Sequence, residues 1–167
     1  MRQLTQTRLR ELLHYDPKTG LFVWRTNRRG MRTGVRAGYV KVFKNVSYLN
    51  IRVDGRHYRA GRLAFLYMTG EWPPDEIDHR DCDGLNNRWE NLRAATRSQN
   101  RANSRLSSNS LTGYKGVTYH RKSCRYRAWI QVGGKGHYLG RFDTPEEAHA
   151  AYVAAAKKYF GEFARAS

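Results

Sequence analysis

Cysteine is scarce in this sequence of 167 residues, and its two cysteines, Cys82 and Cys124, stand 42 residues apart. Because neither has another cysteine nearby, the chain has neither the closely spaced pair of a zinc clamp nor the framework of a disulfide-stabilised secreted domain. No apolar run reaches the about 18 residues that cross a membrane, and the N-terminal MRQLTQTRLRELL is charged throughout, unlike a signal peptide. We therefore expect a cytoplasmic protein that binds no zinc and no membrane.

Acidic residues are also few, since 14 Asp and Glu stand against 31 Lys and Arg, which gives a formal net charge of +17. Such a charge attracts polyanions and makes their binding depend on salt, so nucleic acid is the expected partner. Charge alone leaves a ribosomal-type or merely soluble basic protein open. The apolar share of 40% and the aromatic share of 13% argue against disorder, because they suffice for one or two small cores.

Residue types suited to phosphodiester hydrolysis gather within 23 residues, from Asp78-His79 through Asn91 to Asn100. Hydrolysis needs a group that takes a proton from water near neutral pH, and histidine, with an ordinary pKa of about 6.5, is such a group. It also needs a hard cation at the phosphate, for which Asp78 offers an anionic oxygen and Asn100 a neutral one. The segment therefore predicts a nuclease that uses one Mg²⁺.

The order Asp-His, Asn-Leu, Asn resembles the active-site unit of HNH homing endonucleases of phages and introns. The resemblance implies a ββα-metal fold, double-stranded DNA as substrate, and one Mg²⁺ for which Mn²⁺ can substitute. It implies that Asp78 and Asn100 hold the metal and that His79 is the general base. It also implies that Asn91 hydrogen-bonds across the turn and holds the base. A lone histidine is more often structural, but these intervals favour catalysis.

The chain departs from this family in two respects. Many phage members have His where this chain has Gly61, so an accessory role of that histidine is not expected here. Many also hold the motif with a zinc ribbon, which two distant cysteines cannot form. We therefore expect packing alone to hold the active-site unit.

Other polar residues of the motif have simpler explanations. Asn86 and Asn87 stand in the expected turn, where asparagine is favoured because it tolerates left-handed backbone geometry. Asp81 and Asp83 are not followed by the twelve-residue ligand pattern of a calcium loop with its final Glu. Solvated turn carboxylates are the expectation for both.

The residues before the motif predict a small region of helices and a β-hairpin. Asp54-Gly55 supplies the positive-φ pair of a tight hairpin turn. The Arg- and Gly-rich residues 27–38 predict a basic loop, which is either an arm that contacts phosphates or a solvated loop without function. We expect helices at residues 4–15 and 61–69, with Leu63, Leu66 and Tyr67 facing the core, and strands at 21–24, 48–53 and 57–60.

The C-terminal part has a different pattern. Thr144 before Pro145, with two acidic residues next, is typical of a helix start, and the helix is expected to run to about Tyr159. We expect a linker at residues 105–112 and three alternating strands at 116–120, 126–132 and 137–142.

This part resembles the ethylene-response-factor (Apetala-type) DNA-binding domain of plants from Tyr114 to Phe163. The motifs that carry the resemblance are Tyr-Lys-Gly-Val at 114–117, Tyr-Leu-Gly-Arg-Phe-Asp-Thr-Pro-Glu-Glu-Ala at 138–148 and Phe-Gly-Glu-Phe-Ala at 160–164. The resemblance implies a three-stranded sheet that enters the major groove and a helix that packs behind it.

The resemblance also implies which side chains contact DNA, because the reading positions fall on alternate residues of the strands. Plant members are richer in Arg at these positions, so their target sequence does not transfer. Gln131 suits adenine and an Arg suits guanine, whereas a core position for Trp129 stays an open alternative. The expected contacts are Thr118, His120, Arg121, Arg125, Arg127, Trp129, Gln131 and Tyr138.

The predicted fold class is therefore α+β. A ββα-metal nuclease motif at 75–104 ends a domain of residues 1–104, and a linker at 105–112 leads to a three-stranded antiparallel sheet packed on one helix at 113–167. The leading function is a Mg²⁺-dependent homing-type DNA endonuclease in a phage or its bacterial host, whose C-terminal domain reads part of the site. The alternatives are a DNA-binding transcriptional regulator with a vestigial nuclease motif and a basic RNA-binding protein. No heptad or long apolar edge indicates a dimer, so a monomer is expected.

Overall fold

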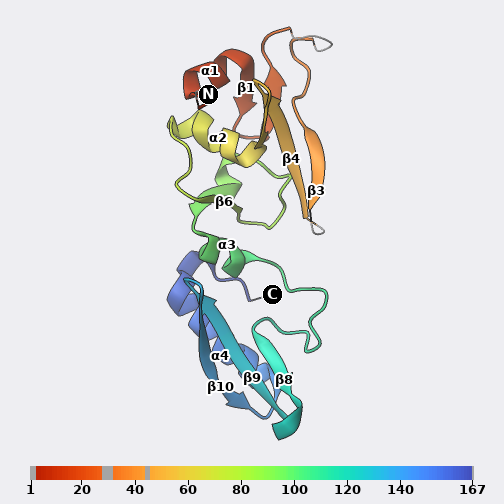
Figure 1. Cartoon of the computed structure of the whole chain (residues 1–167), viewed down its shortest axis with the longest axis vertical. Coiled ribbons are helices and arrows are strands. Elements are labelled where there is room, and N and C mark those ends of the chain that lie inside the picture. The colour runs from red at the N-terminus through yellow and green to blue at the C-terminus, as the bar shows by residue number, and fades with distance from the viewer. Residues whose placement is uncertain (1–2, 28–31, 44–45, 167) are drawn as a thin grey trace. The chain divides into compact units, whose positions relative to one another are not determined.

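The computed structural model describes residues 3–27, 32–43 and 46–166, which form a mixed α+β structure (Figure 1). The chain divides into two compact units, Met1–Ala94 and Ala95–Ser167, each of which is described by itself. Residues 28–31 of the Arg- and Gly-rich segment lie outside the described residues. None of the helices found in the described ranges has the length and apolar character needed to cross a bilayer.

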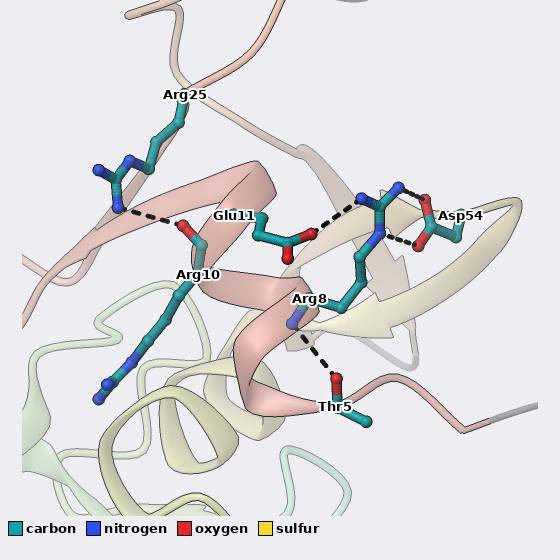
Figure 2. Close-up of polar contacts among 6 residues, drawn as sticks. All are labelled: Thr5, Arg8, Arg10, Glu11, Arg25 and Asp54. Carbon is teal, nitrogen blue, oxygen red and sulfur yellow. Dashed lines mark hydrogen bonds and ion pairs between the residues drawn. The ribbon is translucent and has the colours of Figure 1, made fainter.

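The first unit begins with helix α1 (Gln6–Leu12), whose N-cap Thr5 accepts a hydrogen bond from the backbone N–H of Arg8 (Figure 2). The helix is shorter than residues 4–15 because the chain turns at Leu13 into strand β1 (Leu13–Asp16). Strand β1 pairs antiparallel with β2 (Leu21–Trp24), which places the side chains of Leu13 and Tyr15 in the core and that of His14 outside.

A three-stranded antiparallel sheet follows, in the order β3 (Tyr39–Phe43), β4 (Val46–Val53) and β5 (Arg56–Arg59). The hairpin turn expected at Asp54-Gly55 is present, and both residues have positive φ, 45° and 83°. Strand β3 was not predicted. Its residues are all exposed, so they carry no alternation of buried and exposed positions.

Helix α2 (Ala60–Thr69) covers the core of the first unit and ends at Gly70, whose left-handed backbone donates its N–H to Leu66. Leu63 and Leu66 face the core as expected, and Tyr67 packs at its edge. Other members of this core come from helix α1 and from the β1–β2 and β3–β5 sheets, and they are Leu9, Leu12, Leu13, Tyr15, Phe22, Trp24, Leu49, Ile51 and Val53.

The strands that carry the predicted motif are β6 (Glu76–His79) and β7 (Leu92–Ala95), which form a two-stranded sheet. Between them runs a long turn that ends in a short 3-10 helix, η1 (Trp89–Asn91). Helix α3 (Arg97–Asn103) follows with the cap expected at Thr96, whose side chain and that of Gln99 each bond the other's backbone N–H.

The second unit has a three-stranded antiparallel sheet in the order β10-β9-β8 with one long helix on one face (Figure 1). This helix, α4, contacts the sheet through the small or aromatic side chains of Ala148, Tyr152, Ala156 and Phe160. The ring of Tyr152 lies against Gly116, where an added methyl group would overlap it, and the φ of Gly116 is +74°. The elements are β8 (Val117–His120), η2 (Arg121–Ser123), β9 (Arg125–Val132), β10 (Lys135–Phe142), α4 (Pro145–Phe160) and η3 (Gly161–Phe163).

Helix α3 packs within this second unit. Ala102 joins a cluster of buried side chains with Ile130, Phe160 and Phe163. Residues 105–112, expected as a linker, contain turns but neither helix nor strand.

Candidate functional site

Asp78 is the last residue but one of strand β6 and a buried carboxylate, with 2% of its surface exposed. The Nε of Arg93, on the paired strand β7, donates to Asp78 Oδ2 at 2.7 Å, and both side chains are buried. A buried ion pair of this kind fixes the carboxylate in one orientation, because in any other orientation each buried charge would have neither its partner nor solvent. Arg93 was not among the predicted site residues. One feature of the sequence could have pointed to Arg93, because it lies in the strand that was expected to lie beside the strand of Asp78.

His79 follows Asp78, and its ring is largely buried. Burial lowers the pKa of His79, and the hydrogen bond with Asn87 and the carboxylates of Asp81, Asp78 and Asp83 oppose this only in part. The ring is therefore neutral near neutral pH. A neutral imidazole is the form that can accept a proton.

Asn87 sets the orientation of this ring, with Oδ1 3.3 Å from His79 Nε2. The amide Nδ2 of Asn87 donates to the carbonyl of Leu85, so Oδ1 is the atom that faces the ring. We assign the ring proton to Nε2 on this basis, which leaves the basic lone pair on Nδ1. Asn87 was expected to serve only in the turn.

The core of the first unit holds Asn87 in place. Only 1% of its surface is exposed, and its backbone carbonyl accepts a hydrogen bond from the hydroxyl of Tyr15 at 2.7 Å. Helix α2 passes the site at Gly61, where an added methyl group would lie 3.4 Å from Asn87 Oδ1 and 3.6 Å from His79 Cε1. A side chain at this position of α2 would therefore begin in contact with both His79 and its partner Asn87.

Asn91 binds the turn between the strands. Its Oδ1 accepts from the N–H of Asp81 at 3.1 Å, and its Nδ2 donates to Asp81 Oδ1 at 3.0 Å and to the carbonyl of Asn86 at 2.8 Å. These bonds cross the turn, whereas the side chain in contact with His79 is that of Asn87.

Asp81 and Asp83 also serve the turn. Burial would raise the pKa of Asp81, but hydrogen bonds from Asp83 N–H and from the amides of Asn86 and Asn91 lower it overall. Within residues 3–27, 32–43 and 46–166, no three His, Cys, Asp or Glu side chains are grouped so as to hold a metal ion. Besides a single carboxylate, a metal here would depend on amide, water and phosphate oxygens, which Mg²⁺ accepts.

Asn100 belongs to the second unit. It lies on α3, half-buried, and its backbone N–H donates to the carbonyl of the N-cap Thr96 at 3.0 Å.

The second unit has an open sheet face on the side away from α4. Ala128 and Ile130 of β9 pack toward α4, so the alternate residues Arg127, Trp129 and Gln131 point the other way. Trp129 is 43% exposed, with its ring 5.1 Å from that of Tyr138, which settles the alternative left open for it: it is not a core residue.

The register places the remaining predicted contacts beside these. Thr118 lies opposite Arg127, and His120 lies opposite Arg125. Partial desolvation and the charges of Arg127 and Arg141 lower the pKa of His120. The exposed Arg125 pairs with Asp143 at 2.9 Å, and Arg121 lies in η2 beyond the strand end.

Arg141 shares this face, directly opposite Arg127, but was not predicted. Strict alternation from Tyr138 points to residues 140 and 142. A bulge between Tyr138 and Gly140 shifts the register by one residue and brings Arg141 to the open face instead.

Comparison with known proteins finds two domains in the chain. Residues 58–102 match the family model of the HNH endonuclease, and residues 112–162 match that of the AP2 domain. The first match begins before the predicted motif and includes α2. The chain thus contains an HNH endonuclease domain followed by an AP2 domain, which confirms both resemblances.

Individual relatives are similar over parts of their length. The chain is 38% identical over 100 residues to the "Uncharacterized HNH endonuclease L560" of Acanthamoeba polyphaga mimivirus, which is 59% of this chain and 51% of that protein. It is 32% identical over 109 residues to the "AP2-like ethylene-responsive transcription factor ANT" of Arabidopsis thaliana, which is 62% of this chain and 20% of that protein. The chain therefore spans about half of the viral relative and a fifth of the plant one.

Proposed function

We propose that this chain, with its HNH endonuclease domain followed by an AP2 domain, is a Mg²⁺-dependent DNA endonuclease of the homing type. The observation that carries the proposal is the placement of His79, a partly buried imidazole next to the buried carboxylate of Asp78, with its Nε2 3.3 Å from Asn87 Oδ1. Burial lowers the pKa of this ring, which favours the neutral form that can accept a proton.

In the proposed reaction, His79 Nδ1 takes a proton from water as the water oxygen bonds to phosphorus. The bond from phosphorus to the 3′ oxygen breaks, and the departing 3′ oxygen takes a proton from a second water, so the products are a 5′ phosphate and a 3′ hydroxyl. Asn87 keeps the ring in the required tautomer, and Arg93 keeps the Asp78 carboxylate in one orientation. Both are therefore positioning residues.

The donor chemistry of the site fits a hard divalent cation, which HNH nucleases typically use. Asp78 would hold it with a carboxylate oxygen, and water would complete its shell. When bound, Mg²⁺ would stabilise the charge that develops on the phosphate and the departing oxygen. One such site cuts one strand at a time, so we expect a monomer that nicks duplex DNA.

The AP2 domain implies DNA binding, and we assign this role to the open face of β8–β10. Aromatic, carboxamide and basic side chains share this face, among them the exposed Trp129, Gln131 and Arg141 and the half-buried Arg127. Carboxamides and guanidinium groups read base edges, and guanidinium groups also bind phosphates. This face would read part of the cleavage site.

The second candidate function is a DNA-binding transcriptional regulator with an inactive nuclease domain. The similarity to plant transcription factors favours it. The intact pair Asp78-His79 and its partners argue against it, because an inactive site has no need of a buried ion pair that costs desolvation energy.

Nicking of supercoiled plasmid distinguishes the two. We expect the purified chain to convert it to the relaxed form with Mg²⁺ and not with EDTA. His79→Ala should abolish nicking and keep DNA affinity, whereas the control His14→Ala, at an exposed position of β1, should keep both nicking and DNA affinity. A wild-type chain that binds the plasmid without nicking it under these conditions would support the regulator.

A further inference from the structure

The first unit has an open sheet face of its own, on strands β3, β4 and β5. Direct partners in an antiparallel sheet share a face, and the register aligns Tyr39 with Arg59 across Asn50, and Lys41 with Tyr48. Leu49, Ile51 and Val53 of β4 point into the core, so these side chains lie on the opposite side. We call the set Tyr39, Lys41, Tyr48, Arg52, His57 and Arg59 the β3–β5 face.

The β3–β5 face is positive and has no internal counter-charge. Lys41, Arg52 and Arg59 are exposed, and none of the strand residues 39–43, 46–53 and 56–59 is acidic. The nearest acid along the chain, Asp54 in the hairpin turn, is engaged by the guanidinium group of Arg8 from α1 (Figure 2). The face therefore suits a polyanion.

Aromatic contacts hold its polar groups in place. The guanidinium carbon of Arg59 lies 4.0 Å from the ring centre of Tyr48, and the hydroxyl of Tyr39 lies 3.1 Å from His57 Nδ1. A guanidinium group stacked on a ring loses little freedom and keeps its N–H groups for an incoming oxygen. The basic and polar groups of this face are therefore held in place for contact with phosphate oxygens.

The β3–β5 face adjoins the candidate active site. The ring of Tyr48 lies 6.3 Å from that of His79, centre to centre. The turn between β6 and β7 packs on the same strand, because an added methyl group at Gly84 would overlap the carbonyl of Ser47 and the ring of Tyr48. The phosphate backbone of a DNA strand bound on this face would therefore lie next to His79.

We propose that the β3–β5 face binds the phosphate backbone of duplex DNA beside the bond that is cut. It is a docking surface of the first unit, separate from the AP2 sheet. The position beside a cut bond rests on the proposed function, whereas DNA binding by the face does not.

The test is the salt dependence of duplex binding by the full chain, measured without divalent metal so that no cutting occurs. Each phosphate contact adds about 0.9 to the slope of log K against log salt. The variant Lys41→Gln/Arg52→Gln/Arg59→Gln should lower this slope by about 2 to 3. A control with the same loss of charge, Arg10→Gln/Lys18→Gln/Arg25→Gln, removes cations of α1 and the β1–β2 region and should lower it by less than 1 (Figure 2).

Equal slopes for the two triple variants would overturn the proposal. Lys41→Gln alone, at an exposed position, should lower the slope by about 1 with an unchanged thermal unfolding temperature, so the test does not depend on the stability of the triple variant. If the wild-type chain failed to nick DNA, the proposed nuclease function would be wrong, but the test of DNA binding by the β3–β5 face would still hold.

Discussion

Burial and one carboxamide decide the charge of His79. Burial alone lowers its pKa, and the neutral partner Asn87 adds no charge that would reverse the shift. Replacement of this partner by a carboxylate is therefore the most direct way to change the pKa of His79 without replacing His79 itself.

We predict that Asn87→Asp moves the acidic limb of the pH–rate profile for nicking to higher pH. A carboxylate beside the ring favours the imidazolium and raises the pKa of His79, so the neutral form appears only at higher pH. The measurement is the single-turnover rate from pH 5 to 8. Asn86→Asp, in the turn, is the matched control, and an identical shift in both variants would contradict the role given to Asn87.

The pair of Asp78 and Arg93 makes a different prediction, on stability. Arg93→Met should cost about 3–5 kcal/mol of unfolding free energy, because it leaves a buried carboxylate without its partner. The second change Asp78→Asn should restore part of the loss. Urea unfolding measures both, with the exposed Arg88→Met as control. A double variant less stable than Arg93→Met would show that the cost of Arg93→Met does not come from an unpaired buried carboxylate.

The sequence could place Asp78 beside His79 but could not identify the side chains that hold them. Asp78 and His79 are neighbours in the chain, so their proximity needs no fold. Asn87 and Arg93 reach them only through the turn and the pairing of β6 with β7, which depend on the whole unit. Arg141 escaped prediction because a bulge breaks the alternation of β10.

At the scale of elements, local signals predicted the caps and the hairpin. Thr96 and Thr144 cap their helices as expected because a capping box needs only a short segment. Leu13 was assigned to the first helix because it continues an apolar helical spacing, but pairing with Trp24 draws it into β1. Strand β3 was missed because the sequence signal of a strand is one buried face, which β3 lacks.

Helix α3 has seven residues, too few to be stable alone. Besides its apolar contacts, the ammonium group of Lys115 donates to the carbonyls of Ala102 and Ser104 at its C-terminal end, at 2.5 and 2.7 Å. A cation at this end also interacts favourably with the helix dipole. The helix that bears Asn100 therefore depends on a residue of the AP2 domain.

We predict that Lys115→Met speeds amide hydrogen exchange in residues 97–104 by about fivefold or more, since each lost bond of this type is worth about 1 kcal/mol. Mass spectrometry of the exchanged peptides measures this. Lys122→Met, in the exposed η2, should leave the same peptides unchanged. Protection that is equal in wild type and Lys115→Met would mean that packing alone holds α3.

At the scale of the molecule, the boundary between compact units falls at Ala94–Ala95, before α3 rather than after it. Sequence motifs place α3 with the nuclease, because the Asp-His, Asn, Asn order ends at Asn100. Packing places it with the AP2 domain, because its buried side chains face Ile130, Phe160 and Phe163. The motif therefore crosses the boundary between the units.

This packing predicts how fragments behave. A fragment of residues 95–167 should unfold at higher urea concentration than one of residues 113–167, because the shorter one exposes the apolar surface that Ala95 and Ala102 cover on Phe160 and Phe163. Circular dichroism at increasing urea compares the two. Both should bind duplex DNA without nicking it, since the sheet that carries Trp129 is intact in each and neither contains His79. Equal midpoints would show that α3 adds nothing to the stability of the second unit.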